Sequence, residues 1–70
     1  MAIGKISIPA ARKMAGLTQK GLGERCNVSE STVANWENFR TEPTISQAQA
    51  IADAVGYHID DLIFLPEDTV

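Results

Sequence analysis

The side chains best suited to a defined chemistry lie close together between residues 30 and 38. The amide of Asn35 can both donate and accept, so it can pair with the N6 and N7 atoms of adenine. Ser31 can bond to a base or a phosphate, and Glu30 can accept from the amino group of cytosine. Ala34 offers a methyl contact to thymine. This set favours contact with base edges in a DNA groove, although the same residues could also form an ordinary polar surface.

Polar and basic side chains around this set could bind the phosphate backbone. Gln19 stands at the expected start of a helix, where free backbone N–H groups and the helix dipole favour an anion. Arg40 is the one basic residue in the loop expected to follow that set. Such contacts position a protein on DNA without reading its sequence. The other candidates are Thr18, Lys20, Asn38 and Thr41.

The apolar residues of Thr18–Glu37 predict two short helices that hold these side chains in place. Leu22 and Cys26 are four positions apart and share one face of a first helix. Val33 and Trp36 are three positions apart and share one face of a second. The buried faces of the two helices would therefore meet, leaving the rest of the second helix accessible.

The residues between these helices favour a tight turn. We expect the helices at about Gln19–Arg25 and Glu30–Asn38. Gly23 faces the crossing point, where only a small residue lets two backbones approach closely. Asn27 tolerates the left-handed conformation needed to reverse the chain. Ser29 is suited to cap the second helix.

The chain resembles the lambdoid phage repressor and Cro family of helix-turn-helix proteins. The resemblance rests on this spacing, on a small residue at position 23 (Gly23 here, where the family usually has alanine), on the runs GLTQ and TVANWEN, and on Pro43, Gly56 and DDL further along. It covers roughly Ile8–Leu65. It implies one domain over residues 1–70 with its core at about 7–65, and an all-α, five-helix, lambda-repressor-like fold.

The resemblance also implies a function. It points to a sequence-specific transcriptional regulator of phage or prophage Cro or repressor type, with Glu30, Ser31 and Asn35 at base edges in the major groove. The partner would be a double-stranded operator bound by a homodimer, with half-sites about 34–36 Å apart. A further implication is an ion pair between Arg12 on the first helix and Glu37. Seventy residues leave no room for a ligand-sensing domain, so the plan is Cro-like.

Helical spacing and capping residues predict three further helices. The first covers about Ile8–Ala15, the fourth about Ile45–Val55, and the fifth Ile59–Phe64. Ala15 and Ile45 are expected to face inward. An extended lead-in before the first helix would have no partner strand in a helical domain.

The residues that end the helix expected at Glu30–Asn38 differ from the family pattern. Phe39 stands where relatives commonly carry a capping glycine, so either Asn38 adopts the left-handed turn or the loop is rebuilt. An aromatic residue here is explained either by local packing or by contact with a partner. Further on, Pro66 is expected to stop the fifth helix and Glu67–Val70 to form a polar tail.

Charge is divided unevenly along the chain, whose formal net charge is −3. All six basic residues lie in the first forty positions, together with three of the nine acidic residues. The half with the candidate contacts is therefore slightly basic, and the acidic remainder would be repelled by DNA and bias its orientation. We expect weak non-specific binding with a shallow salt dependence.

The residue types argue against several other functions. One histidine, one cysteine and no glycine-rich phosphate loop argue against an enzyme, a small-molecule substrate, a cofactor or a metal site. The lone Cys26 forms no internal disulfide, which suits a reducing cytoplasm, and is expected to be a small core residue. No apolar run reaches membrane-spanning length. We therefore expect a protein of the bacterial host cytoplasm.

A second function stays open, in which the same scaffold binds a partner repressor protein and modulates it. Phe39, the exposed apolar C-terminal residues or the acidic half would then supply the contacts. Four apolar residues near the C-terminal end could form a patch for self-association, or could equally be core: Ile59, Ile63, Phe64 and Leu65. An antitoxin role would be a variant of the DNA-binding hypothesis.

Overall fold

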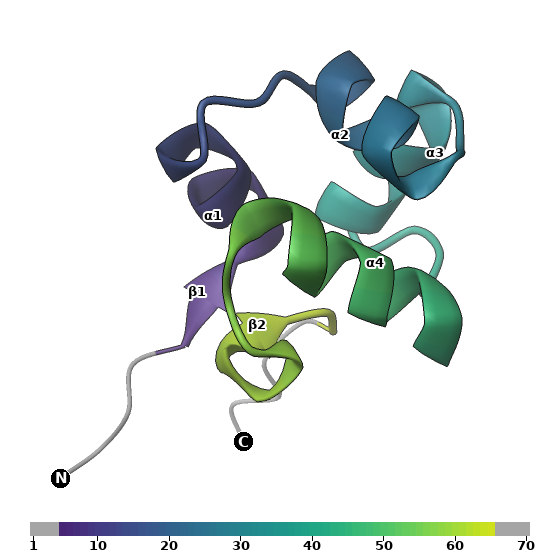
Figure 1. Cartoon of the computed structure of the whole chain (residues 1–70). Coiled ribbons are helices and arrows are strands. Elements are labelled where there is room, and N and C mark those ends of the chain that lie inside the picture. Colours follow the sequence, from purple (N-terminus) through teal and green to yellow (C-terminus); the bar gives the residue numbers. More distant parts are fainter. Residues whose placement is uncertain (1–4, 66–70) are drawn as a thin grey trace, which may run out of the picture.

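The structure, a computed structural model, describes residues 5–65. In this range it contains β1 (Ile6–Ser7), α1 (Ile8–Met14), α2 (Gln19–Cys26), α3 (Glu30–Glu37), α4 (Ile45–Val55), the 3-10 turn η1 (Ile59–Asp61) and β2 (Leu62–Ile63). In Figure 1, α2 and α3 lie at the upper end of the molecule and the two strands toward the lower end, with α4 between them. None of these helices has the length and apolarity needed to cross a membrane.

A hydroxyl side chain begins each of the four α-helices. Each N-cap residue is extended, and its side chain accepts a hydrogen bond from a backbone N–H in the first turn. These residues are Ser7, Thr18, Ser29 and Thr44. In α4 the side chain of Gln47 bonds back to the N–H of Thr44, which completes a capping box. A cap of this kind contributes about 1 kcal/mol, so the local sequence decides where these helices begin.

The core forms where the four α-helices converge. Trp36 is the largest fully buried side chain, and Ile8, Leu22, Val33 and Ile51 are buried in the same cluster. Burying an apolar side chain of this size contributes about 1.5–3 kcal/mol, which makes this cluster the main source of stability in so small a domain. Because every α-helix supplies a member, the helices hold one another in a fixed arrangement.

The fifth helix predicted over Ile59–Phe64 does not form, so the fold is not purely α-helical. The chain makes one 3-10 turn and then the extended strand β2, which pairs in parallel with β1. Ile6 lies opposite Leu62, and Ser7 lies opposite Ile63. The extended lead-in thus has the partner strand that the sequence did not reveal. Pairing satisfies backbone N–H and C=O groups of both segments, and Leu62 enters the core.

Two residues predicted to face inward are exposed instead. Ala15 is the C-cap of α1, and Ile45 is the first residue of α4, with 86% of its surface accessible. Both stand at helix ends, which extend beyond the neighbours that the helices pack against, so helical spacing does not imply burial there. The predicted stop at Pro66 and the tail Glu67–Val70 lie outside the described residues.

Candidate nucleic-acid interface

The turn between α2 and α3 depends on two residues with special backbone requirements. Asn27 adopts the left-handed conformation at φ 62° and ends α2. A Cβ atom added at Gly23 would lie 2.7 Å from the carbonyl oxygen of Val28, closer than real Cβ contacts come. Glycine at this position lets the turn fold tightly back on α2 and sets the start of α3.

One face of α3 is buried and the rest is accessible. Val33 and Trp36 are exposed by 0% and 1%, so they anchor the helix in the core. The predicted base-contact residues fall at other positions of the helix: Glu30 and Ser31 are exposed, and Ala34 and Asn35 are half-buried. Helical geometry places these four residues along one side, since Ala34 and Asn35 follow Glu30 and Ser31 by one helical turn. Because Val33 and Trp36 anchor the helix in the core, α3 presents its polar groups to solvent in a fixed orientation.

A buried ion pair joins α1 to the end of α3. Nε of Arg12 lies 2.6 Å from Oε2 of Glu37, and Nη2 of Arg12 donates to Oε1 of Glu37 at 3.3 Å. The two side chains are only 10% and 6% exposed. Nη1 of Arg12 also donates to the carbonyl oxygen of Leu17 at 3.0 Å. The guanidinium thus fixes the C-terminal end of α3 against α1 and the loop that leads to α2.

Gln19 belongs to the same network, which the sequence did not predict. Its side-chain Nε2 donates to Oε1 of Glu37 at 3.0 Å, so the first residue of α2 is tied to the last residue of α3. In this arrangement the amide of Gln19 positions Glu37. The contact joins residues eighteen positions apart, for which the sequence offers no local signal.

The chain leaves α3 through a left-handed turn made by Phe39. Asn38 has φ −97°, and its side-chain Nδ2 donates to the carbonyl oxygen of Ala34 at 2.9 Å. Phe39 itself takes φ 59°, so neither sequence alternative described this turn correctly. The N–H of Phe39 bonds to the carbonyl of Trp36, and that of Arg40 to the carbonyl of Asn35. This is the Schellman pattern. A residue with a side chain costs about 1–2 kcal/mol in this conformation.

The candidate phosphate contacts lie in two segments of the chain, one at the start of α2 and one after α3. The exposed members are Thr18 and Lys20 at the start of α2, and Arg40 and Thr41 after α3. Asn38 is exposed as well, although its side-chain amide is already bonded within α3. Because Gln19 at the start of α2 is bonded to Glu37 at the end of α3, the fold brings both groups toward the C-terminal end of the same short helix.

Cys26 shows no sign of activation as a nucleophile. It is a free, half-buried thiol that packs against the core from the last position of α2. Burial raises the pKa of the Cys26 thiol, which disfavours the reactive thiolate. A packing role is the simplest account of this residue.

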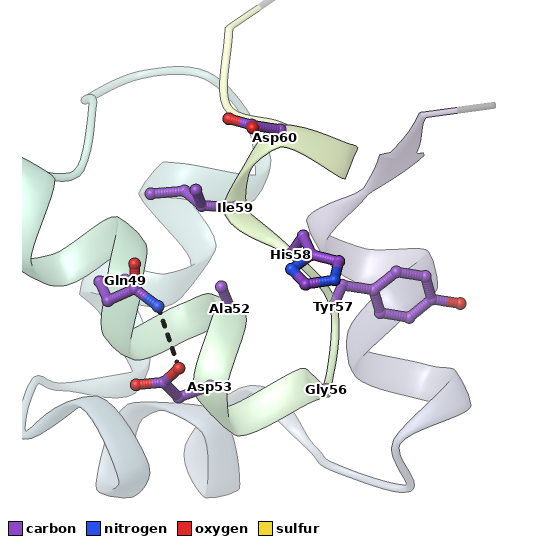
Figure 2. A pocket seen from close by; sticks show the side chains of 8 residues that line it. All are labelled: Gln49, Ala52, Asp53, Gly56, Tyr57, His58, Ile59 and Asp60. Carbon is purple, nitrogen blue, oxygen red and sulfur yellow. Dashed lines mark hydrogen bonds between the residues drawn. The ribbon is translucent and has the colours of Figure 1, made fainter. Parts of the chain in front are cut away.

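A separate depression lies beside α4 and η1 (Figure 2). Gln49 and Asp53 on α4 are joined by a hydrogen bond of 3.0 Å, and Asp60 lies on the opposite rim. None of the predicted DNA contacts lines it, and its carboxylates would repel phosphate. Within residues 5–65 no group of three or more His, Cys, Asp or Glu side chains is arranged to hold a metal ion. We therefore place the candidate interface at α3.

Comparison with known proteins adds independent findings. The sequence profile of a family described as helix-turn-helix matches residues 9–62. An uncharacterized HTH-type transcriptional regulator of Methanothermobacter thermautotrophicus is 43% identical over 58 residues, covering 81% of this chain and 84% of that protein. The immunity repressor protein of Bacillus phage phi105 is 36% identical over 63 residues, covering 90% of this chain but only 43% of that protein. No solved structure matches at a comparable level of significance.

Proposed function

Because this chain belongs to the helix-turn-helix family, we propose that it is a sequence-specific DNA-binding transcriptional regulator of phage or prophage repressor or Cro type. The family and the names of its two relatives support DNA-binding regulation in general. The observation that carries the finer proposal is the orientation of α3, which buries Val33 and Trp36 and leaves Glu30 and Ser31 exposed and Asn35 half-buried. Such a protein would act on DNA in the host cytoplasm.

In this proposal α3 enters the major groove and reads base edges. Asn35 pairs with adenine, Glu30 accepts from cytosine, and Ser31 bonds to a base or a phosphate. Ala34 contacts a thymine methyl group. The buried faces of α3 and the Arg12–Glu37 pair support this role, because a helix held against the core presents its side chains in a defined register.

Phosphate contacts from the start of α2 and from the loop after α3 would position the domain. Arg40 supplies the charge after α3, and Lys20 supplies one at the start of α2. Since the side chain of Gln19 is bonded to Glu37, its contact to phosphate would come from the backbone N–H at the helix start. Few basic groups take part, so the salt dependence of binding is expected to be shallow.

We propose a homodimer on a pseudo-palindromic operator. An apolar groove between the start of α4 and β2 supports this idea, with Ile45, Ala48, Leu62, Phe64 and Leu65 among its lining residues. Leu65 is 52% exposed, so the groove retains apolar surface for a second copy to cover. Sedimentation of the protein with a duplex that carries two half-sites would test this. A complex of one chain per duplex would contradict it.

Two substitutions test the base-reading role. The affinity of each variant is measured for duplexes that the wild-type protein has enriched from a randomised library, and for random duplex. Asn35→Ala should remove about 1–3 kcal/mol of discrimination at one position. Arg40→Ala should weaken both duplexes alike and lower the slope of log K against log salt by about 0.9. Equal losses on enriched and random duplex for Asn35→Ala would contradict the role of that residue.

The same titration separates the second candidate function, the binding of a partner repressor. The acidic residues of the later half and the exposed apolar groove favour it. If the chain enriches no sequence alone and gains DNA affinity only when a repressor is added, the partner-binding function replaces the one proposed above.

A further inference from the structure

Phe39 is not explained by the stability of the fold. Its side chain remains 42% exposed, so packing recovers only part of its apolar surface. Its backbone has φ 59°, a conformation that is a genuine outlier for a bulky residue. Glycine would make the same turn without strain. Strained residues of this kind concentrate at binding sites, where the surrounding structure holds them.

The position of Phe39 is fixed by hydrogen bonds on both sides. Its N–H donates to the carbonyl of Trp36 at 3.2 Å, and the next N–H, of Arg40, donates to the carbonyl of Asn35 at 2.9 Å. The turn is thus folded onto the last turn of α3. It holds the backbone of residue 39 between the exposed Asn38 and the exposed Arg40.

We propose that Phe39 contacts the deoxyribose carbons of the DNA backbone beside the groove that α3 enters. This inference rests on the proposed function. Because Arg40 and Thr41 would lie at phosphates, the DNA backbone that they bind would pass beside residue 39. The sugar between two phosphates is its apolar part, and an aromatic ring can cover it.

Such a contact would suit an acidic protein. With a net charge of −3, the chain can neutralise few phosphates, so electrostatic attraction alone supplies little affinity. Burial of apolar surface releases no counterions and therefore adds affinity that does not fall with salt. Because hydrogen bonds fix the backbone of this turn in the free protein, binding does not have to order the loop that carries the ring.

The test uses Phe39→Gly and Phe39→Asn, two residues that tolerate the left-handed turn. Binding to random duplex of about 20 base pairs, or two helical turns, is measured across a range of salt concentrations. Covering the exposed part of a phenylalanine is worth roughly a tenfold change in affinity. We expect both variants to bind about tenfold more weakly, with an unchanged salt slope. The melting temperature should stay within a few degrees, because relief of strain offsets the lost packing.

Photocrosslinking gives a direct readout. A photoreactive phenylalanine analogue at position 39 should crosslink to duplex DNA. The same analogue at Leu65, an exposed position two residues after β2, should not. Crosslinking of residue 39 only to a second protein chain would overturn the inference.

Three binding results would also overturn it. Unchanged affinity in both variants, with wild-type binding intact, would leave the proposed function standing and remove only the Phe39 contact. A salt slope lowered by about one would mean that the loop had moved and carried Arg40 away from its phosphate. Absence of any duplex binding by the wild type would remove both proposals. Arg40→Ala serves as the positive control, because it should show the effect of losing a phosphate contact.

Discussion

Removal of the Arg12 guanidinium tests how strongly the buried ion pair holds α3. Arg12→Met keeps most of the apolar stem but leaves the carboxylate of Glu37, only 6% exposed, with the amide of Gln19 as its remaining partner. It also removes the donor to the carbonyl of Leu17. The folded state then contains a desolvated charge that the unfolded state exposes to water.

The structure sets the size of the effect. Breaking a buried pair by removing one partner costs about 3–5 kcal/mol. For a domain of this length, each kcal/mol corresponds to a shift of about 4–8 °C in melting temperature, so we expect a decrease of at least about 12 °C. Since small domains are stable by only about 5–15 kcal/mol, part of the population could unfold at ambient temperature.

Trp36 offers a direct assay. It is the single tryptophan of the chain and is 1% exposed, so its fluorescence reports unfolding in urea or on heating. Arg25→Met is the matched control, because Arg25 is exposed and its loss should cost less than about 0.5 kcal/mol. The double variant Arg12→Met/Glu37→Leu should recover much of the loss, since no unpaired buried charge remains. If Arg12→Met costs no more than Arg25→Met, the reasoning about burial is refuted.

Two further predictions concern α2. Gly23→Ala should destabilise the protein by about 1–3 kcal/mol in urea denaturation, because its Cβ would meet the backbone of the following turn at 2.7 Å. Gly21→Ala in the same helix should change stability by less than about 1 kcal/mol, and equal effects of the two would contradict the close approach. Because burial raises the pKa of the Cys26 thiol above its ordinary 9.0, the folded state retains the proton that the unfolded state loses. The contribution of this thiol to stability is therefore full at neutral pH and is lost as pH rises past 9.0. In urea denaturation, Cys26→Ala should remove this part of the decrease in the free energy of unfolding at alkaline pH.

Local signals allowed much of the geometry of the two helices, α2 and α3, to be predicted. Ser29 begins its helix as expected, and Asn27 takes the left-handed turn. Val33 and Trp36 are buried as their spacing indicated. Each of these features depends on residues within one helical turn of one another, which is the range over which sequence patterns carry information.

Long-range contacts could not be predicted in the same way. The side chain of Gln19 bonds to Glu37, and β1 pairs with β2, because the tertiary fold brings distant segments together. The apolar residues after Asp61 suited a helix as well as a strand. The strand β2 is favoured because the extended segment before α1, at the other end of the chain, has backbone groups that need a partner.

The order of caps, apolar anchors and turn residues by itself determined four helices and the pairing of α2 with α3, because each depends on neighbours in the chain. The tertiary structure alone decided that the chain closes with a small parallel sheet, that Gln19 supports Glu37, and that Phe39 makes the left-handed turn. The physical reason is that backbone hydrogen bonds, buried charges and local strain are balanced over the whole molecule, so the lowest free energy at one position depends on residues far away in the sequence.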